Sequence, residues 1–209
     1  MGNIDVSTMG FSGRMGPTVA YVVNGHQRFR TYTKPNNPKT EKQTVHRSRF
    51  GFVSSKLSPL FKEIKLGFKD SNLNYGTVCG KVNREAVVGE FPNLALDYSK
   101  IKIAEGKLSI PINPSVKIDK TYIANFEWNT ENDSKWNLTP EDDKINIVCF
   151  NETVPSEIFR RNSFKRKSGK AVIELPKHWS ADVTHFWLYA ASWNMEENSD
   201  SVYVEETKV

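Results

Sequence analysis

Cysteine is scarce in this sequence of 209 residues, which contains only Cys79 and Cys149. Two thiols are too few for a disulfide scaffold, and neither belongs to a C-x-x-C pair that could bind zinc or carry redox chemistry. Cys149 lies in the apolar run Ile145–Phe150 and is expected to be a small buried residue. The cysteines therefore predict neither a disulfide-stabilised fold nor a zinc site.

Long apolar runs are also missing, since no stretch approaches the roughly 20 residues that a membrane-spanning helix needs. The N-terminus has no basic segment followed by an apolar one, so no signal peptide is visible. Val6 stands where a myristoylation pattern requires Ser or Thr. We expect a soluble protein, cytoplasmic or virion-associated, although a secreted form without its leader would look the same.

Recognisable catalytic and metal-binding spacings are absent. The four histidines form no i, i+4 pair and no H-E-x-x-H motif; they are His26, His46, His178 and His185. No G-x-S-x-G elbow occurs, and the acidic group at 141–143 lacks the spacing of a calcium loop. We therefore predict no catalytic residue, cofactor or metal ligand. A pair of hydrolytic carboxylates among the 24 acids stays open as an alternative.

Apolar residues are present in sufficient number for a folded core, at 38% of the chain with 11% aromatics. The net charge of +5 is uneven. Residues 1–104 hold 16 Lys and Arg against 7 Asp and Glu, a net charge of +9, whereas residues 105–209 hold 13 against 17, a net charge of −4. This asymmetry indicates two halves with different surfaces and leaves open an anionic partner for the first.

The first forty residues have the pattern of β structure. Two β-rich runs, Thr18–Val23 and His26–Tyr32, flank Asn24-Gly25. Asn-Gly between such runs predicts a hairpin, because a type I′ turn needs positive φ at both central residues.

Helices are expected next, after Pro35 and Pro38. Thr40 and Gln43 fit a capping box at the start of the first helix. Apolar residues then recur at spacings of three and four, and Pro59 interrupts them, so Ser58 is expected to cap a second short helix that ends near Gly67. A third helical pattern runs from Tyr75 to Ala86.

From about residue 99 the apolar period changes to two. Eight candidate strands follow, at 100–104, 107–112, 121–128, 144–150, 156–161, 170–175, 183–192 and 201–205. We therefore predict an α+β unit over residues 1–98 and an antiparallel β-sandwich over residues 99–209. Trp128, Trp187 and Tyr189 are expected at the centre between the two sheets. The second half resembles immunoglobulin-like or fibronectin type III domains without their disulfide.

Two basic patches are candidate anion-binding or nucleic-acid-binding surfaces. Their residues are Arg28, Arg30, Lys39, Lys42, Arg47 and Arg49 in the first patch, and Arg160, Arg161, Lys165, Arg166 and Lys167 in the second. The alternative is that both are solvated faces. No recognition helix, zinc module or RNA-stacking motif supports reading of bases, so any such binding would depend on phosphates.

Three loose motifs carry a family resemblance. They are Gly10-Phe-Ser-Gly13-Arg-Met-Gly16, then Pro38-Lys-Thr40-Glu-Lys-Gln43 with Arg47 and Phe50, and then Leu57-Ser-Pro59-Leu60 with Gly67-Phe68. Together with the ending Ser199-x-Ser201-x-Tyr203, they resemble a family of uncharacterised Bacteroidetes proteins, domain of unknown function 6266. The resemblance implies no catalytic residues. The segment around Thr40 is also similar to phage-encoded proteins.

The resulting prediction is a non-enzymatic structural or protein-interaction module of phage, prophage or cell-surface origin, with an unidentified protein as its partner. The first alternative is a nucleic-acid-associated protein that binds phosphates through the basic N-terminal half. The second alternative is an unrecognised hydrolase.

Overall fold

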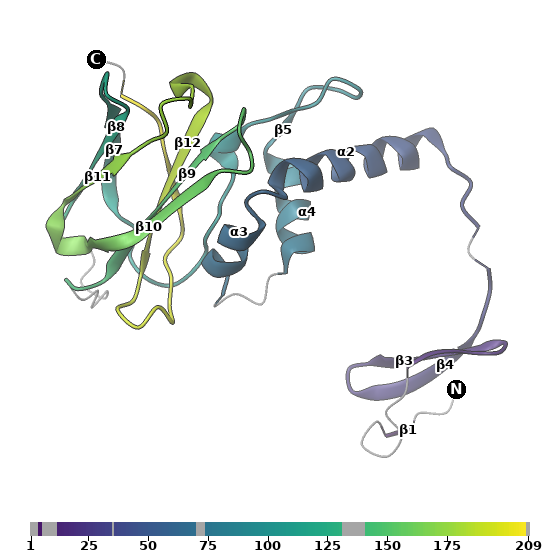
Figure 1. Cartoon of the computed structure of the whole chain (residues 1–209). Helices are drawn as coiled ribbons and strands as arrows, with labels where there is room; N and C mark the ends of the chain where they lie inside the picture. Colours follow the sequence, from purple (N-terminus) through teal and green to yellow (C-terminus); the bar gives the residue numbers. More distant parts are fainter. Residues whose placement is uncertain (1–3, 6–11, 35, 70–73, 131–140, 208–209) are drawn as a thin grey trace. The chain divides into compact units, whose positions relative to one another are not determined.

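Figure 1 shows the computed structural model of the chain, which describes residues 4–5, 12–34, 36–69, 74–130 and 141–207. The contacts divide the chain into two compact units, residues 1–41 and residues 42–209. The expected boundary between residues 98 and 99 lies inside the second unit; as a statement about domains it stays a prediction.

The first unit is a small antiparallel sheet with the strand order β1-β4-β3-β2. The strands are β1 (Ile4–Asp5), β2 (Gly13–Met15), β3 (Thr18–Val23) and β4 (His26–Thr31). Asn24 and Gly25 connect β3 to β4 with φ angles of 49° and 78°. Because both angles are positive, as a type I′ turn requires, the predicted hairpin is confirmed.

The second unit begins with three helices, α2 (Glu41–Leu57), α3 (Phe61–Gly67) and α4 (Tyr75–Glu85). The first starts directly after Thr40, where the capping box predicted it. The prediction that Ser58 caps α3 is wrong, because Leu60 occupies the N-cap without a side-chain bond. A turn at 58–60 separates the two helices, and the Ser58 carbonyl, not its hydroxyl, accepts from the Phe61 amide at 3.2 Å.

Two sheets follow and pack as a sandwich (Figure 1). One has the order β10-β9-β12-β13 and the other β11-β8-β7, with antiparallel pairing in both ladders. The strands are β7 (Ile112–Ile118), β8 (Ile123–Asn129), β9 (Lys144–Asn151), β10 (Ile158–Lys165), β11 (Lys170–Glu174), β12 (Thr184–Ala191) and β13 (Val202–Val204). This arrangement confirms the predicted immunoglobulin-like sandwich, an architecture that fibronectin type III domains share.

Shorter elements complete the second unit. They are the two-stranded pair β5 (Val87–Val88) and β6 (Ala95–Leu96), and the 3-10 turns η1 (Tyr98–Lys100), η2 (Arg166–Ser168) and η3 (Ala181–Val183).

Two of the predicted strands, at 100–104 and 107–112, are wrong. The chain forms η1 and then an extended segment that joins no sheet ladder apart from a single bridge between Leu108 and Ser199. Ile101 and Ile103 alternate with lysines because both pack into the core beneath the helices, where they are 2% and 0% exposed. The first strand of the sandwich is instead β7, at 112–118.

The buried apolar side chains of the second unit form two clusters. One lies between the two sheets and includes Trp128, Phe186 and Leu188. The other joins the helices to the outer face of the four-stranded sheet and includes Trp187 and Tyr189. Trp128 is therefore central, as predicted, but Trp187 and Tyr189 are not, since successive residues of a strand point to opposite faces and both faces of β12 are buried.

Close backbone contact between α3 and the extended segment requires glycine at position 67. A Cβ atom there would collide with the Ile103 carbonyl and with Ala104. The Ser201 hydroxyl accepts from the amides of Ile103 and Ala104 at 2.9 and 3.3 Å. The segment after η1 is thus held between helix and sandwich, and this position forms one wall of the groove described next.

Candidate functional site

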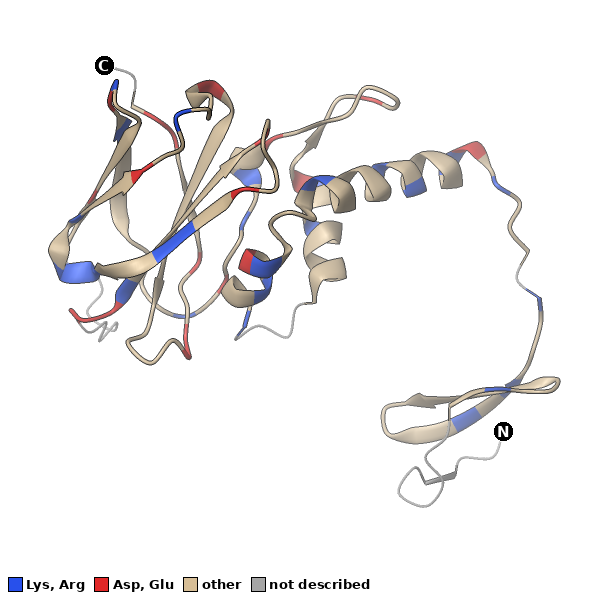
Figure 2. Cartoon of the chain, viewed as in Figure 1, with Lys and Arg blue, Asp and Glu red and all other residues tan. Residues whose placement is uncertain are grey.

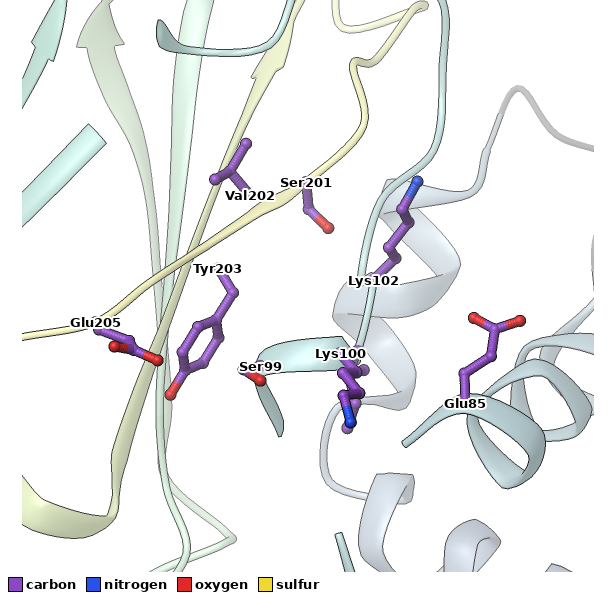
Figure 3. Close-up of a pocket in the computed structure, with 9 residues that line it drawn as sticks. Glu85, Ser99, Lys100, Lys102, Ser201, Val202, Tyr203 and Glu205 are labelled. Carbon is purple, nitrogen blue, oxygen red and sulfur yellow. The ribbon is translucent and has the colours of Figure 1, made fainter. Parts of the chain in front are cut away.

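A shallow groove of about 680 Å³ lies on the second unit between the end of α4, η1 and β13 (Figure 3). Its lining residues are Glu85, Ser99, Lys100, Ile101, Lys102, Ser201, Val202, Tyr203 and Glu205. In Figure 3, Glu85 lies at one end of the groove, Glu205 lies at the other, and the Tyr203 ring stands beside Glu205. A smaller cavity of about 130 Å³ shares Glu85 and both lysines with it.

Buried hydrogen bonds fix the shape of the groove. The indole N–H of Trp187 donates to the Ile101 carbonyl at 2.9 Å, and the Ser201 amide donates to the Ala104 carbonyl at 3.1 Å. The Asp97 carboxylate caps η1 by accepting from the Ser99 amide at 3.1 Å. Because these contacts tie η1 and its following segment to the sandwich, the groove is a preformed feature of the fold.

Carboxylates outnumber cations around the groove. Lys100 pairs with Asp97 at 3.2 Å, and Lys102 pairs with Asp200 at 2.7 Å. The hydrogen bond to Asp200 raises the pKa of Lys102 more than burial lowers it, which keeps this amine charged.

Two further carboxylates, Glu85 and Glu205, have no ion-pair partner within 4.0 Å in the described part of the chain. Two lysines therefore meet four carboxylates, and the local charge is negative. The arrangement suits a cationic group.

Behind the groove, three side chains form a hydrogen-bonded chain. The His185 Nδ1 atom lies 2.9 Å from the Tyr203 hydroxyl, and Nε2 lies 3.2 Å from the Glu152 carboxylate. The imidazole also stacks on the Tyr98 ring at a centroid distance of 4.2 Å. With Nε2–H donating to Glu152, Nδ1 accepts from the Tyr203 hydroxyl, whose oxygen can still accept a bond from a ligand.

Burial acts on both titratable rings of this chain. It lowers the pKa of His185, against the opposing effect of Glu152, and it raises the pKa of Tyr203. Both shifts favour neutral forms, so the phenol is a poor nucleophile at neutral pH. His185, expected to be an ordinary histidine beside the sandwich core, has hydrogen-bond partners on both ring nitrogens.

The first predicted basic patch falls on both units. Arg28, Arg30 and Lys39 belong to the first unit, and the remaining three residues, on α2, belong to the second. Among these three, Lys42 and Arg47 are exposed. Figure 2 shows the basic positions on β4 and along α2.

Within this patch Arg49 has a structural role. Its Nη2 atom donates to the Asn83 carbonyl at 3.0 Å and its Nε atom donates to the Asn83 side chain at 3.4 Å, which ties α2 to α4.

The second predicted patch is largely neutralised by contacts within the second unit. Lys165 and Lys167 both pair with Asp142, at 2.8 and 3.3 Å. Arg160 pairs with Glu63 at 3.3 Å.

The last two residues of this patch differ in exposure. Arg166 is 7% exposed and donates to the carbonyls of Ser109 and Ile110 at 2.5 and 3.4 Å. Arg161 is exposed and lies over the Phe159 ring, 5.7 Å from its centroid. The site prediction for both patches stays a prediction, with most of the second patch already engaged.

The described ranges contain neither a cluster of metal ligands nor a membrane-spanning helix. No group of three or more His, Cys, Asp and Glu side chains there could hold a metal ion. No described helix has the length and apolar character to span a bilayer. Both cysteines are buried and free, and burial raises the pKa of Cys149 to about 12, so this thiol remains protonated.

Sequence reasoning did not identify the groove, because Lys100, Tyr203 and Glu205 were assigned to strands and Glu85 to a helix end. One signal was present in the ending Ser199-x-Ser201-x-Tyr203. The Ser199 hydroxyl accepts from the Ala190 amide at 2.8 Å, and Ser201 holds the segment after η1. The serines of this motif are therefore structural supports of the groove.

Comparisons with known proteins concern the fold and the family. No curated protein matches the chain. Among solved structures it is similar to the fn3 domain of human contactin 1, with 9% identity and a TM-score of 0.29, over 50% of this chain and 84% of that domain. The model of a family of unknown function, DUF6266, matches residues 10–205. Since this match covers most of the 209 residues, the chain belongs to the DUF6266 family.

Proposed function

We propose that the protein is a non-enzymatic structural or protein-interaction module, and that its acidic groove binds a basic segment of a protein partner. The observation that carries this proposal is the pair of carboxylates, Glu85 and Glu205, which lack an ion-pair partner in the described chain and line a groove with Tyr203. Glu205 beside the Tyr203 ring suits a guanidinium group, which pairs with acids and stacks on rings, and Glu85 at the other end of the groove can pair with a second cation.

The affinity of this groove for one basic side chain is modest by nature. Both carboxylates are exposed, and an exposed ion pair contributes only about 0.2–1 kcal/mol. Specific binding therefore needs several contacts, such as a segment with two spaced arginines. This fits a module that recognises a partner surface better than one that holds a small ligand.

Hydrolysis is a less suitable function for the same residues. The chain Glu152–His185–Tyr203 has the order of a carboxylate–imidazole–hydroxyl relay, but its hydroxyl is a phenol whose raised pKa keeps it protonated. The groove is also shallow and open. Its hydrogen-bonded chain is better suited to orienting Tyr203 as one wall of a binding surface.

A labelled hexa-arginine peptide tests the proposal by fluorescence anisotropy. The full chain should bind it at low salt, and Glu85→Gln with Glu205→Gln should weaken binding by about three- to tenfold, the loss of two exposed pairs. The matched control replaces two exposed carboxylates of the other sheet, Glu127→Gln and Glu174→Gln. Equal affinity for the groove and control variants would contradict the proposal.

Nucleic-acid association through the basic N-terminal half is the second candidate. It is supported by Arg28 and Arg30, which have no ion pair in the described part of the chain. Duplex DNA should then bind with an affinity that falls steeply with salt, and Arg28→Gln with Arg30→Gln should weaken it. Lys165→Gln with Lys167→Gln, which removes cations already paired with Asp142, should change it less. Binding that does not weaken with salt argues against this candidate.

A further inference from the structure

We propose that the basic segment recognised by the acidic groove comes from a second copy of this chain, whose N-terminal sheet presents it. This inference rests on the proposed function, because it names the partner of the same groove. It depends on two observations: an arginine-bearing face on the first unit and the opposite charge of the groove.

One face of the N-terminal sheet carries several basic side chains, and we call it the arginine face. Directly opposed residues of neighbouring strands share a face, and the register pairs Arg14 with Val19, Val19 with Arg30, and Tyr21 with Arg28. The face therefore consists of Asp5, Arg14, Val19, Tyr21, Val23, His26, Arg28 and Arg30. Its three arginines outnumber the one acidic position, Asp5, which pairs with His26 in the register.

Two of these arginines project together from one strand. Arg28 and Arg30 are alternate residues of β4, so their side chains project in the same direction, about 7 Å apart along the strand. Arg30 is exposed, whereas Arg28 is half-buried with a buried Nε atom that has no hydrogen-bond partner. Arg14 lies over the Tyr32 ring at 3.8 Å and is less available.

The described part of the first unit buries few apolar side chains. Of its described residues, Ala20 is the one buried apolar side chain. Met15, Val22 and Val23 are 51%, 44% and 37% exposed. Val23 lies on the arginine face, whereas Met15 and Val22 lie on the opposite face, so a contact through the arginines would cover Val23 but not the other two.

Charge complementarity selects the groove as the surface that receives the arginine face. The groove lining has two carboxylates without an ion pair in the described chain and two lysines, each of which is paired with an aspartate beside the groove. The arginine face brings three arginines against one acidic position, Asp5.

Such a contact joins two different surfaces of one chain, so it is heterologous. It generates head-to-tail assemblies, which close into rings or continue as filaments according to the rotation between copies. Assembly would be weak at physiological salt, because exposed charges dominate it and are screened beyond about 8 Å.

Sedimentation velocity of the full chain tests the inference. The weight-average mass should rise above the monomer mass of 23.8 kDa with increasing concentration at about 50 mM salt, and should return to it at about 500 mM. Lys65→Glu with Lys177→Glu, two exposed lysines outside both surfaces, should leave assembly unchanged. A monomer at every concentration, including one whose sheet docks on its own chain, overturns the inference.

A charge exchange identifies the contact. Arg28→Glu with Arg30→Glu, and separately Glu85→Arg with Glu205→Arg, should each abolish assembly alone, and mixing the two variants should restore it as a mixed complex. Thermal unfolding shows whether each variant is folded. If hexa-arginine binds the groove but mixing restores nothing, the inference fails and the proposed function survives. Assembly that requires added duplex DNA likewise overturns it.

Discussion

Trp187→Phe is the substitution that most directly tests how the fold supports the groove. Trp187 is fully buried on the helix-facing side of β12, and its indole N–H donates to the Ile101 carbonyl at 2.9 Å. Its ring contacts those of Tyr98 and Tyr203 at centroid distances of 6.4 and 5.6 Å. Three walls of the groove thus meet at this one side chain.

The expected cost has two parts. Phenylalanine cannot donate to the Ile101 carbonyl, and an unsatisfied buried acceptor costs about 1–3 kcal/mol. The smaller ring also leaves a cavity, which costs about 1–2 kcal/mol when the neighbours relax only partly. The free energy of unfolding should therefore fall by about 2–4 kcal/mol, which in a chain of this length lowers Tm by roughly 5–15 °C.

Urea denaturation and amide hydrogen exchange measure these effects. Trp128→Phe is the matched control, because its indole donates to the Arg166 carbonyl at 2.8 Å in the other core. Both variants should be destabilised, but only Trp187→Phe should speed exchange at residues 99–104. A loss below about 0.5 kcal/mol, typical of surface substitutions, would refute the reasoning. So would equal exchange in the two variants.

Three further predictions follow from other contacts. Burial lowers the pKa of His185 below 6.5, so the folded state favours the neutral ring. The stabilisation by this neutral ring is complete above about pH 6.5, the pKa of the unfolded state, and is lost as the pH falls through the lower pKa of the folded state. His185→Gln should therefore reduce the decline of Tm between about pH 7.5 and 5.5, and an unchanged decline would contradict this assignment. Asn74 caps α4 by accepting from the Thr77 amide at 2.9 Å, so Asn74→Ala should lower the free energy of unfolding, measured by urea denaturation, by about 1 kcal/mol. The control is Asn93→Ala, which changes an asparagine that does not cap a helix. Gly67→Ala should cost at least about 1–3 kcal/mol because its Cβ would overlap the Ile103 carbonyl, whereas Gly51→Ala on α2 meets open space and should not destabilise.

Local rules predicted the elements that local chemistry determines. Asn24-Gly25 specified the hairpin through two positive φ angles, and Thr40 marked the start of α2. Strands β8 to β13 were found because their alternation and polar turns are intrinsic to the sequence. The sandwich could therefore be predicted without any tertiary information.

Tertiary packing determined what the sequence could not show. The alternation around Ile101 and Ile103 has the period of a strand, but it records burial against the helices instead of sheet pairing. Trp187 and Phe186 are neighbours with equal apolar character, so no pattern could say which of them faces the second sheet. A strand that is buried on both faces has apolar residues at successive positions, so its sequence does not show which residues point to which face.

The groove was unpredictable for a related reason. Its lining comes from residues 85, 99–102 and 201–205, which only the fold brings together. The two basic patches, by contrast, were visible as runs of charge, but a run does not reveal its partners. Much of the second patch is neutralised by two acids from elsewhere in the fold, Glu63 on α3 and Asp142 in the loop that precedes β9.

Amide spectra of the ¹⁵N-labelled chain, recorded during a titration with hexa-arginine, test most directly whether the groove receives a basic group. The account predicts that the largest shift changes fall at residues 99–102 and 201–205, and that the Glu85→Gln, Glu205→Gln variant needs about three- to tenfold more peptide to reach them. Shift changes spread over other acidic surfaces, with these two segments unaffected, would contradict it.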